Sequence, residues 1–211
     1  KVSIKPPQTE AAPALKVSYG TDLMAFDADI DARTQVASVN TLAWDPKTQQ
    51  ALTASASPQS LGLQGDLNGT TLAQVLPKAE CTLRTSAAQE PAVLTQWAKA
   101  QQVKAELARV RGRVKFQGSA LALAGQVLEV AGVGTRFNGK VYAGAVQHDV
   151  DDGNWTTEVE FGLAPEWRVT RSDVVAPHAG ALVPGVVGLQ VAVVTKLDAD
   201  PVNAHRIQVR T

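Results

Sequence analysis

The chain has 211 residues, with 20 Lys and Arg set against 20 Asp and Glu, a single cysteine and 45% hydrophobic residues. Zero formal net charge argues against a nucleic-acid binder and against a protein held to anionic lipid by charge. One cysteine excludes an intrachain disulfide framework and a cysteine-based zinc site. No apolar run approaches the roughly 18 residues of a membrane-spanning helix.

The length suits one domain of ordinary size, or one domain with a fragment of another. The opening sequence KVSIKPP is typical neither of a signal peptide nor of a natural start. We therefore expect a soluble piece of a longer protein. Residues 1–14 are polar and rich in Pro and Ala, which predicts an extended linker.

A two-residue period begins at Leu15 and predicts β-strands. In residues 24–30 the alternation predicts a half-buried strand with an acidic outer face. Residues 35–44 predict a second strand, which ends at Trp44. The inward set of the first strand is Met24, Phe26, Ala28 and Ile30, and the outward set is Asp27, Asp29 and Asp31.

Residues 53–90 lose this pattern, and we interpret them as a polar insertion with one weak helical turn at 71–76. Residues 91–110 then predict the one long helix, since Pro91 suits the first helical position and Gly112 follows the last apolar residue. Its expected apolar stripe covers the open side of a barrel and buries Trp97 and Leu107. The stripe consists of Val93, Trp97, Ala100, the stem of Lys104, Leu107 and Val110.

The rest of the chain alternates again. We predict strands at 113–116, 126–130, 140–150 and 155–161, with hairpin turns at 132–139 and 149–154. Residues 162–186 are expected to form a connector, and 189–195 and 206–210 a last hairpin-like pair. Two strands do not make a stable domain, so this final module is expected to be incomplete.

Residues 134–140 match the first seven positions of a phosphate-binding P-loop. The eighth residue is Val141, which offers no hydroxyl to magnesium, and the expected context is strand–turn–strand without a following helix. A glycine-rich hairpin explains the segment better than a nucleotide site does.

Other candidate chemistry is weak. Asp27, Asp29 and Asp31 lie on a solvated strand face, and two further clusters are interpreted as turn residues: Asp149, Asp151 and Asp152, and Asp198 and Asp200. The histidines, His148, His178 and His205, show no metal-ligand spacing, and Cys81 has no companion motif. Trp44, Trp97, Trp155 and Trp167 offer a sugar-stacking platform in principle, but Trp97 and Trp155 are expected to pack in the core.

Several segments, taken in order, resemble the Vgr (valine-glycine repeat) spike proteins of type VI secretion systems and related contractile injection systems, which are akin to contractile-phage tail hub proteins. The resemblance runs from about residue 15 to 211. The matching segments are DARTQ (31–35), AWD (43–45), WA (97–98), RVRGRVKFQG (109–118), AGVGTRFNGK (131–140), GNWTT (153–157), FGLAPEW (161–167) and GLQV (188–191).

The resemblance implies a mainly β (α+β) fold: a tube-like β-barrel hub domain at 15–168, a linker at 169–188, and the truncated start of an OB-fold barrel at 189–211. The first hub barrel, the needle and any effector domain would lie outside this chain. The motif residues would be structural; they are Arg33, Trp44, Trp97, Arg111, Gly112, Arg113, Phe137, Gly139, Trp155, Gly162 and Trp167.

The function implied is that of a hub connecting the tail tube to the piercing needle, without enzymatic activity, cofactor or metal. Implied partners are two further copies of the chain in a homotrimer of the full-length protein, a tail-tube protein, baseplate components and spike-tip or effector proteins. Neither nucleic-acid binding nor stable membrane anchoring is expected. The protein would assemble in the bacterial cytoplasm without a signal peptide and be expelled with the apparatus, or form part of a virion.

Two alternatives from other classes stay open: a cell-wall hydrolase domain of the kind that some phage hubs carry, and a glycan-binding β module. The absence of a carboxylate dyad, a nucleophile signature or a metal set from the sequence favours the structural hub. Because no uncommitted apolar stripe is large enough for a stable interface, these 211 residues alone are predicted to be monomeric or weakly self-associating.

Overall fold

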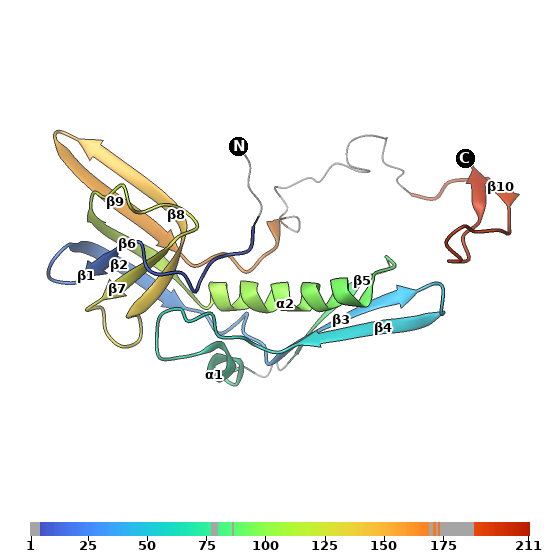
Figure 1. The fold of residues 1–211 in the computed structure, drawn as a ribbon, viewed down its shortest axis with the longest axis horizontal. Helices are drawn as coiled ribbons and strands as arrows, with labels where there is room; N and C mark the ends of the chain where they lie inside the picture. The colour runs from blue at the N-terminus through green and yellow to red at the C-terminus, as the bar shows by residue number, and fades with distance from the viewer. Residues whose placement is uncertain (1–4, 77–79, 86, 169–170, 172, 174–187) are drawn as a thin grey trace.

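The computed structural model describes residues 5–76, 80–85, 87–168, 171, 173 and 188–211. A curled six-stranded sheet occupies one end of the main body, and a smaller sheet lies beside a long helix at the other (Figure 1). The strands of the larger sheet, in order across it, are β1 (Lys16–Ser18), β7 (Val127–Ala131), β8 (Gly139–Asp151), β9 (Asn154–Phe161), β6 (Val110–Gln117) and β2 (Leu23–Ile30).

The six-stranded sheet forms a half-barrel, which we call the half-barrel below. Its neighbours pair antiparallel except for β1 and β7, which are parallel. Alternate residues point to one apolar core: Val114 and Phe116 from β6 lie against Val159 and Phe161 from β9, all at most 2% exposed. The predicted period-two strands and the mainly β class are confirmed, because burying one face of a pleated strand imposes this alternation.

Strand β2 departs from its predicted pattern at one end. Phe26, Ala28 and Ile30 pack against the half-barrel core as expected, but Met24 is 51% exposed. The pairing of β2 with β6 shifts between Leu23 and Ala25, which marks a β-bulge. A bulge reverses which residues face inward, so Leu23 packs on the core where Met24 was predicted to lie.

Both predicted hairpins are confirmed. Strands β8 and β9 are joined by Asp152 and Gly153, which have φ of 47° and 78°. Two consecutive left-handed residues are what a two-residue hairpin turn needs, and an Asp-Gly pair supplies them at low cost. Strands β7 and β8 are joined across the P-loop-like segment, which therefore lies in a strand–turn–strand context.

The segment 53–90, interpreted as a polar insertion, contains strands that were not predicted, and its predicted helical turn at 71–76 corresponds to a short helix. It supplies most of β4 (Gln50–Ala56), the short helix α1 (Gly69–Ala73) and β5 (Glu80–Thr85). Strand β3 (Ser38–Asp45) pairs antiparallel with β4 and parallel with β5, giving a three-stranded sheet. The inward positions of β4 and β5 are only half-buried and hold several small or weakly apolar residues, such as Ala54 and Cys81, so their period was weak in the sequence.

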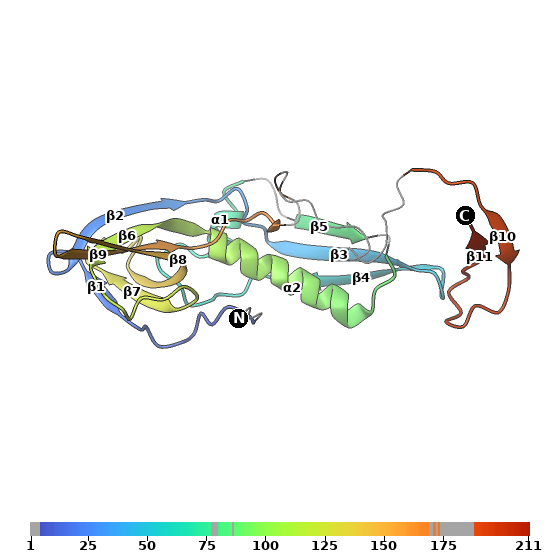
Figure 2. The same cartoon turned by 90° about the horizontal axis from the view of Figure 1, so that it is seen from above.

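The predicted long helix is confirmed as α2 (Pro91–Ala108), but its position and its buried face differ from the prediction. It packs across β3 and β4 and so covers the three-stranded sheet (Figure 2), not the open side of the half-barrel. Leu94 and Ala98 are fully buried, whereas Val93 is 49% exposed and Trp97 only half-buried. The predicted stripe, which contains Val93 and Trp97, and the buried stripe, which contains Leu94 and Ala98, have the same spacing along the helix. The small Ala side chains let the sheet approach the buried stripe closely.

The helix ends earlier than predicted. Arg109 caps it and the chain enters β6 directly at Val110, so Gly112 lies within a strand instead of stopping a helix. Leu107 is buried as expected. Among the described residues, none of the helices is both long enough and apolar enough to cross a membrane.

Near the end of the chain, β10 (Val193–Lys196) pairs antiparallel with β11 (Gln208–Arg210), as the predicted last hairpin requires. That these strands begin an OB-fold barrel stays a prediction, as does the division at residues 168 and 189. Most of the predicted linker, including His178, lies outside the described residues.

Candidate functional site

A buried polar cluster lies where α2 meets β6, and we call it the joint. At its centre is Arg109, which is 3% exposed. Its guanidinium donates to the Glu106 carboxylate at 2.9 Å and to the backbone carbonyls of Gln64 at 2.9 Å and Leu67 at 2.5 Å. A buried guanidinium needs such partners, because an unpaired charge away from water is costly.

Two further groups complete the joint. Gln35 is 3% exposed, and its side-chain amide donates to the Ala105 carbonyl at 2.7 Å. Gly69 begins α1 between these polar groups: a Cβ there would lie 2.8 Å from Glu106 Oε2 and 2.9 Å from Gln35 Oε1. Only glycine fits at this position without displacing the carboxylate or the amide.

The joint connects the two sheets. The backbone N–H of Gln64 donates to the Lys140 carbonyl at 2.8 Å, and that of Gly65 to the Asn138 carbonyl at 3.0 Å. Asp66 adds an ion pair with Arg136 at 3.2 Å. The loop before α1 is therefore held at once by Arg109 and by the start of β8. The sequence reasoning missed these roles; the signal was a charged pair, Glu106 and Arg109, at the end of an amphipathic helix.

A second contact holds the other side of α2. Trp167 Nε1 donates to Gln101 Oε1 at 2.7 Å, and its ring lies 4.9 Å from Lys104 Nζ. Lys104 Nζ also donates to the carbonyls of Ala164 at 3.3 Å and Glu166 at 2.9 Å. Burial lowers the pKa of the Lys104 ammonium from its ordinary value. The chain after β9 is thereby fastened along the C-terminal half of the helix.

The motif residues of β6 lie where this strand pairs with β2 on one side and with β9 on the other. Gly112 pairs with Ala28 on β2 and with Phe161 on β9, and a Cβ there would collide with the Asp27 carbonyl. Arg113 and Arg111 point to the outer face, where Arg113 lies 3.9 Å from Asp27 and Arg111 lies 3.5 Å from Asp31. Gly112 thus permits close strand contact, and the arginines neutralise the acidic face of β2.

Three other motif residues support the half-barrel. Phe137 packs edge-on against Phe26, with ring centroids 5.9 Å apart. Gly139 has φ of 125°, and a Cβ there would lie 3.0 Å from Gln64 Cα, beside the joint. Gly162 has φ of 75°, and a Cβ there would collide with the Val110 carbonyl.

The remaining motif residues lie apart from these. Trp155 is 36% exposed, covers Gly118 and lies 5.8 Å from the His148 ring. Trp44 is half-exposed near the end of β3, and Trp97 is half-buried on α2. The tryptophans therefore line no common platform, although Trp97 and Trp167 both lie along the same helix.

Arg33 is exposed, but it makes a two-bond contact with Asp31, at 2.9 Å from Nε and 2.7 Å from Nη2. These hydrogen bonds hold the pKa of Asp31 down to about 2. The carboxylate is thus a local anchor after β2, close to Arg111.

The acidic candidates show no catalytic geometry. Asp27 and Asp29 lie opposite Arg113 and Arg111 in the β2–β6 register. His148 contacts Thr157 Oγ1 at 2.9 Å. Within the described part of the chain, no group of three His, Cys, Asp or Glu side chains is placed to hold a metal ion.

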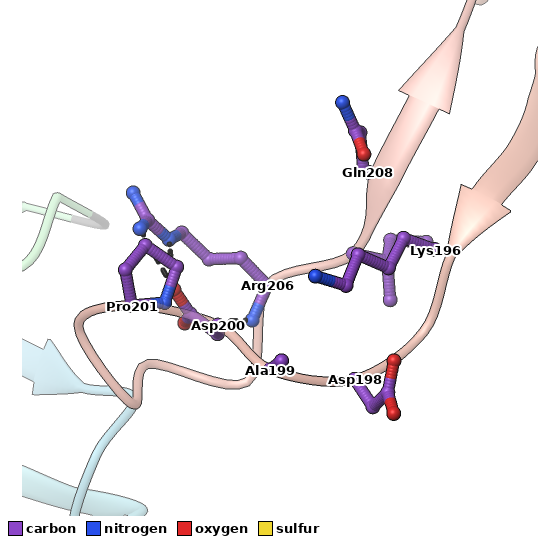
Figure 3. A pocket seen from close by; sticks show the side chains of 8 residues that line it. Lys196, Asp198, Ala199, Asp200, Pro201, Arg206 and Gln208 are labelled. Carbon is purple, nitrogen blue, oxygen red and sulfur yellow. Dashed lines mark hydrogen bonds and ion pairs between the residues drawn. The ribbon is translucent and has the colours of Figure 1, made fainter.

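A hollow of about 410 Å³ lies at the loop that joins β10 to β11, beside Asp200 and Arg206 (Figure 3). The Asp200 carboxylate accepts hydrogen bonds from the Arg206 side chain and from the backbone N–H groups of Val202, Ala204 and Arg206. The Arg206 guanidinium, followed by these N–H groups, holds the pKa of Asp200 well below its ordinary value. Asp200 thus closes its own loop, as predicted for a turn residue.

The architecture is similar to that of tail proteins. The 43 kDa tail protein of prophage MuSo2 from Shewanella oneidensis matches with a TM-score of 0.50 and 5% identity, over 71% of this chain and 42% of that protein. A tail protein from Neisseria meningitidis MC58 matches at 12% identity and a TM-score of 0.48, over 73% and 45%. The first of these matches shows that this chain has the fold of that tail protein. The chain spans less than half of either protein.

The family is identified by sequence. Residues 1–152 match the Alg8 N-terminal domain, and the chain belongs to that family. No curated protein matches the sequence. The matched region includes the half-barrel up to the β8–β9 turn, α2 and the joint.

Proposed function

We propose that the protein is a structural part of the spike complex of a contractile injection machine, serving as a hub between the tail tube and the needle. The tail-protein fold is the observation that carries this proposal. The ordered motifs shared with Vgr spike proteins support the narrower assignment to a spike hub.

The joint supports a mechanical role for the protein. Arg109 ties the end of α2 to the loop that also pairs with β8, so the two sheets are linked by hydrogen bonds as well as by the chain. A hub that transmits the thrust of a contracting tail must not bend between its parts. A buried guanidinium whose three nitrogens each donate a hydrogen bond gives such a connection a defined geometry.

We propose the same partners as the resemblance implies: two further copies in the full-length protein, a tail-tube protein, baseplate components and spike-tip or effector proteins. In this proposal the protein is expelled with the apparatus or belongs to a virion. The proposal includes no enzymatic role; it is supported by Asp27, which lies 3.9 Å from Arg113, and by Asp29, which lies opposite Arg111 in the β2–β6 register.

Electron microscopy of particles tests the assignment. Particles assembled from full-length protein carrying an epitope at its C-terminus should bind antibody at one end of the tail, and particles lacking the gene should have no spike. The matched control is a full-length Gly112→Val variant, which should fail to fold and reproduce the deletion. Label along the whole tail, or normal spikes in the deletion, would contradict the proposal.

Light scattering coupled to size exclusion tests the oligomer prediction. The 211-residue chain should elute as a monomer or a weak, concentration-dependent associate. A concentration-independent mass near three chains would show that this region carries the trimer interface by itself. Turnover of peptidoglycan by the chain, abolished by Asp27→Asn with Asp29→Asn, would favour the hydrolase alternative.

A further inference from the structure

Strand β5 and helix α2 both contribute residues to two separate hollows, and we call the strip that runs from one hollow to the other the α2–β5 groove. Within the described residues, β5 is an edge strand that pairs with β3 alone. Alternate backbone N–H and C=O groups of an edge strand point away from its sheet and are free to pair with another chain. Figure 2 shows β5 along one side of the sheet, while α2 crosses the sheet diagonally.

The groove contains two hollows. The first, of about 230 Å³, is lined by Val36, Cys81 and Ala105 among others. The second, of about 210 Å³, is lined by Thr85, Gln89, Val93 and Trp97.

The residues of β5 and of α2 that line the two hollows are separated by the distance between residues i and i+4 of an extended peptide. Leu83 lies midway between Cys81 and Thr85, and all three are half-buried. Cys81 and Thr85 are four strand residues apart, or about 13 Å. On α2, Trp97 and Ala105 are eight helical residues apart, or about 12 Å. Residues i and i+4 of an added strand are also about 13 Å apart, so their side chains reach the two hollows.

The walls are already held in place. Leu83 packs on the cluster formed by Val39 and Ala98. Gln101, which lines the first hollow, accepts its hydrogen bond from Trp167. A site with fixed walls loses less conformational entropy when a peptide binds.

The charges of the groove select a neutral occupant. Arg33 and Glu166 both line the first hollow and are of opposite sign. The second hollow is lined by uncharged side chains. An apolar side chain therefore suits the second hollow, where a charged one would lose water without gaining a partner. In the first hollow the two opposite charges favour neither sign, and Arg33 is already held by Asp31.

We propose that the α2–β5 groove binds an extended, uncharged segment of a partner protein. The segment pairs with the free edge of β5 and places apolar side chains i and i+4 in the two hollows. Strand addition beside a helix combines main-chain hydrogen bonds, which provide affinity, with side-chain hollows, which provide selectivity. The inference rests on the groove and is independent of the proposed hub function.

Two nine-residue synthetic peptides test it with the 211-residue chain. Both consist of Thr with a terminal Lys, and positions 3 and 7 are Val in one and Asp in the other. In an NMR titration, the Val peptide should shift the amide signals of β5 saturably and bind at least about tenfold more tightly than the Asp peptide. Equal affinity of the two peptides, or no binding by the Val peptide, would overturn the proposal.

Two matched variants locate the site. Val93→Glu should weaken binding of the Val peptide by about tenfold, because it places a carboxylate in the second hollow. Ala92→Glu, its exposed neighbour outside the hollow, should change binding less than about twofold. Both add an acid to the first turn of α2, where it favours the helix, so both should fold. Unchanged binding by Val93→Glu would place the peptide elsewhere and refute the assignment.

Two further controls define the binding mode. Only alternate backbone N–H groups of an added strand face β5. Methylating either the odd-numbered or the even-numbered nitrogens of the Val peptide should therefore abolish binding, and methylating the other set should leave it unchanged. Loss of binding by both methylated peptides, or by neither, would contradict strand addition. If the chain alone self-associates and Val93→Glu makes it monomeric, the occupant is a second copy, and the peptide proposal fails.

Discussion

The half-barrel and the region built from α2 and the three-stranded sheet are stabilised by different means. Counted over the described residues, the half-barrel core contains eleven buried hydrophobic residues, with Phe116 and Leu128 among the largest. On the same count, the cluster between α2 and the smaller sheet contains three, Val36, Val39 and Ala98. The second region therefore depends more on its polar contacts with the first, above all on Arg109. In this second region, hydrogen bonds between α2 and the loop before α1 add to the stability that the small hydrophobic cluster provides.

The largest expected effect is on the half-barrel core. Phe116→Ala removes a side chain that is 1% exposed and should cost about 3–5 kcal/mol of unfolding free energy. Chemical denaturation should show the loss for the whole protein. Val39→Ala should cost less and open mainly the smaller sheet, which hydrogen exchange would resolve. Equal losses of protection in both regions after Val39→Ala would show that they unfold as one unit.

Breaking the joint should come next. Arg109→Met leaves the Glu106 carboxylate buried without its partner and should cost about 3–5 kcal/mol. The amides of Gln64 and Gly65 should lose hydrogen-exchange protection first, because Arg109 holds their loop.

The control for the joint is Arg111→Met. Arg111 is about 40% exposed and lies 3.5 Å from Asp31, so its loss should cost under about 1 kcal/mol. Adding Glu106→Leu to Arg109→Met should restore part of the stability, since the double variant leaves no unpaired charge. A double variant less stable than Arg109→Met would refute the role given to this pair.

A smaller effect is expected on the exposed side of α2. Trp97 is half-buried, so Trp97→Ala should cost under about 2 kcal/mol, well below the loss of a fully buried aromatic side chain. Leu94→Ala, at 0% exposed, should cost about 2–5 kcal/mol. Thermal melts of the two variants show which face of α2 is buried. A larger loss of thermal stability for Trp97→Ala than for Leu94→Ala would show that the apolar stripe predicted from the sequence is the buried one.

The smallest effect concerns Asp31, whose pKa the Arg33 side chain lowers to about 2. Because the folded pKa lies below the unfolded value, this stabilisation is complete above about pH 5 and is lost as pH falls through about 2. Arg33→Gln should remove only this small contribution, since Arg33 is exposed and its ion pair is screened by water. Urea unfolding of the parent protein and of Arg33→Gln at about pH 6 and about pH 2 measures this stabilisation. An equal pH dependence of the unfolding free energy in the two proteins would contradict the role given to Arg33.

Sequence patterns located the half-barrel well because each of its long strands buries one face. The alternation at Val114 and Phe116 is the direct mark of that burial. The Asp152–Gly153 turn was equally readable, since few residue pairs accept two positive φ values. The strands β4 and β5 were missed, because their buried positions hold small or weakly apolar residues such as Ala54 and Cys81.

The motif residues were predicted as structural without a reason for each, and the structure supplies several reasons. Gly112 is close to the Asp27 carbonyl, and Gly162 to that of Val110. Neither neighbour is adjacent in the chain, so spacing in the sequence held no sign of these contacts. Arg109 stood inside a quoted motif but was not singled out, because its partners Gln64 and Leu67 lie more than forty positions earlier.

The sequence by itself determined the mainly β class, the long helix, both tight hairpins and the absence of a recognisable catalytic motif. Each of these depends on neighbours within a few positions, where periodicity and turn chemistry act. The tertiary structure alone decided that α2 covers a second sheet, that Leu94 instead of Val93 is buried, and that Arg109 joins the two sheets. These outcomes depend on which surfaces meet across 40 to 70 positions of chain, and no local pattern encodes that choice.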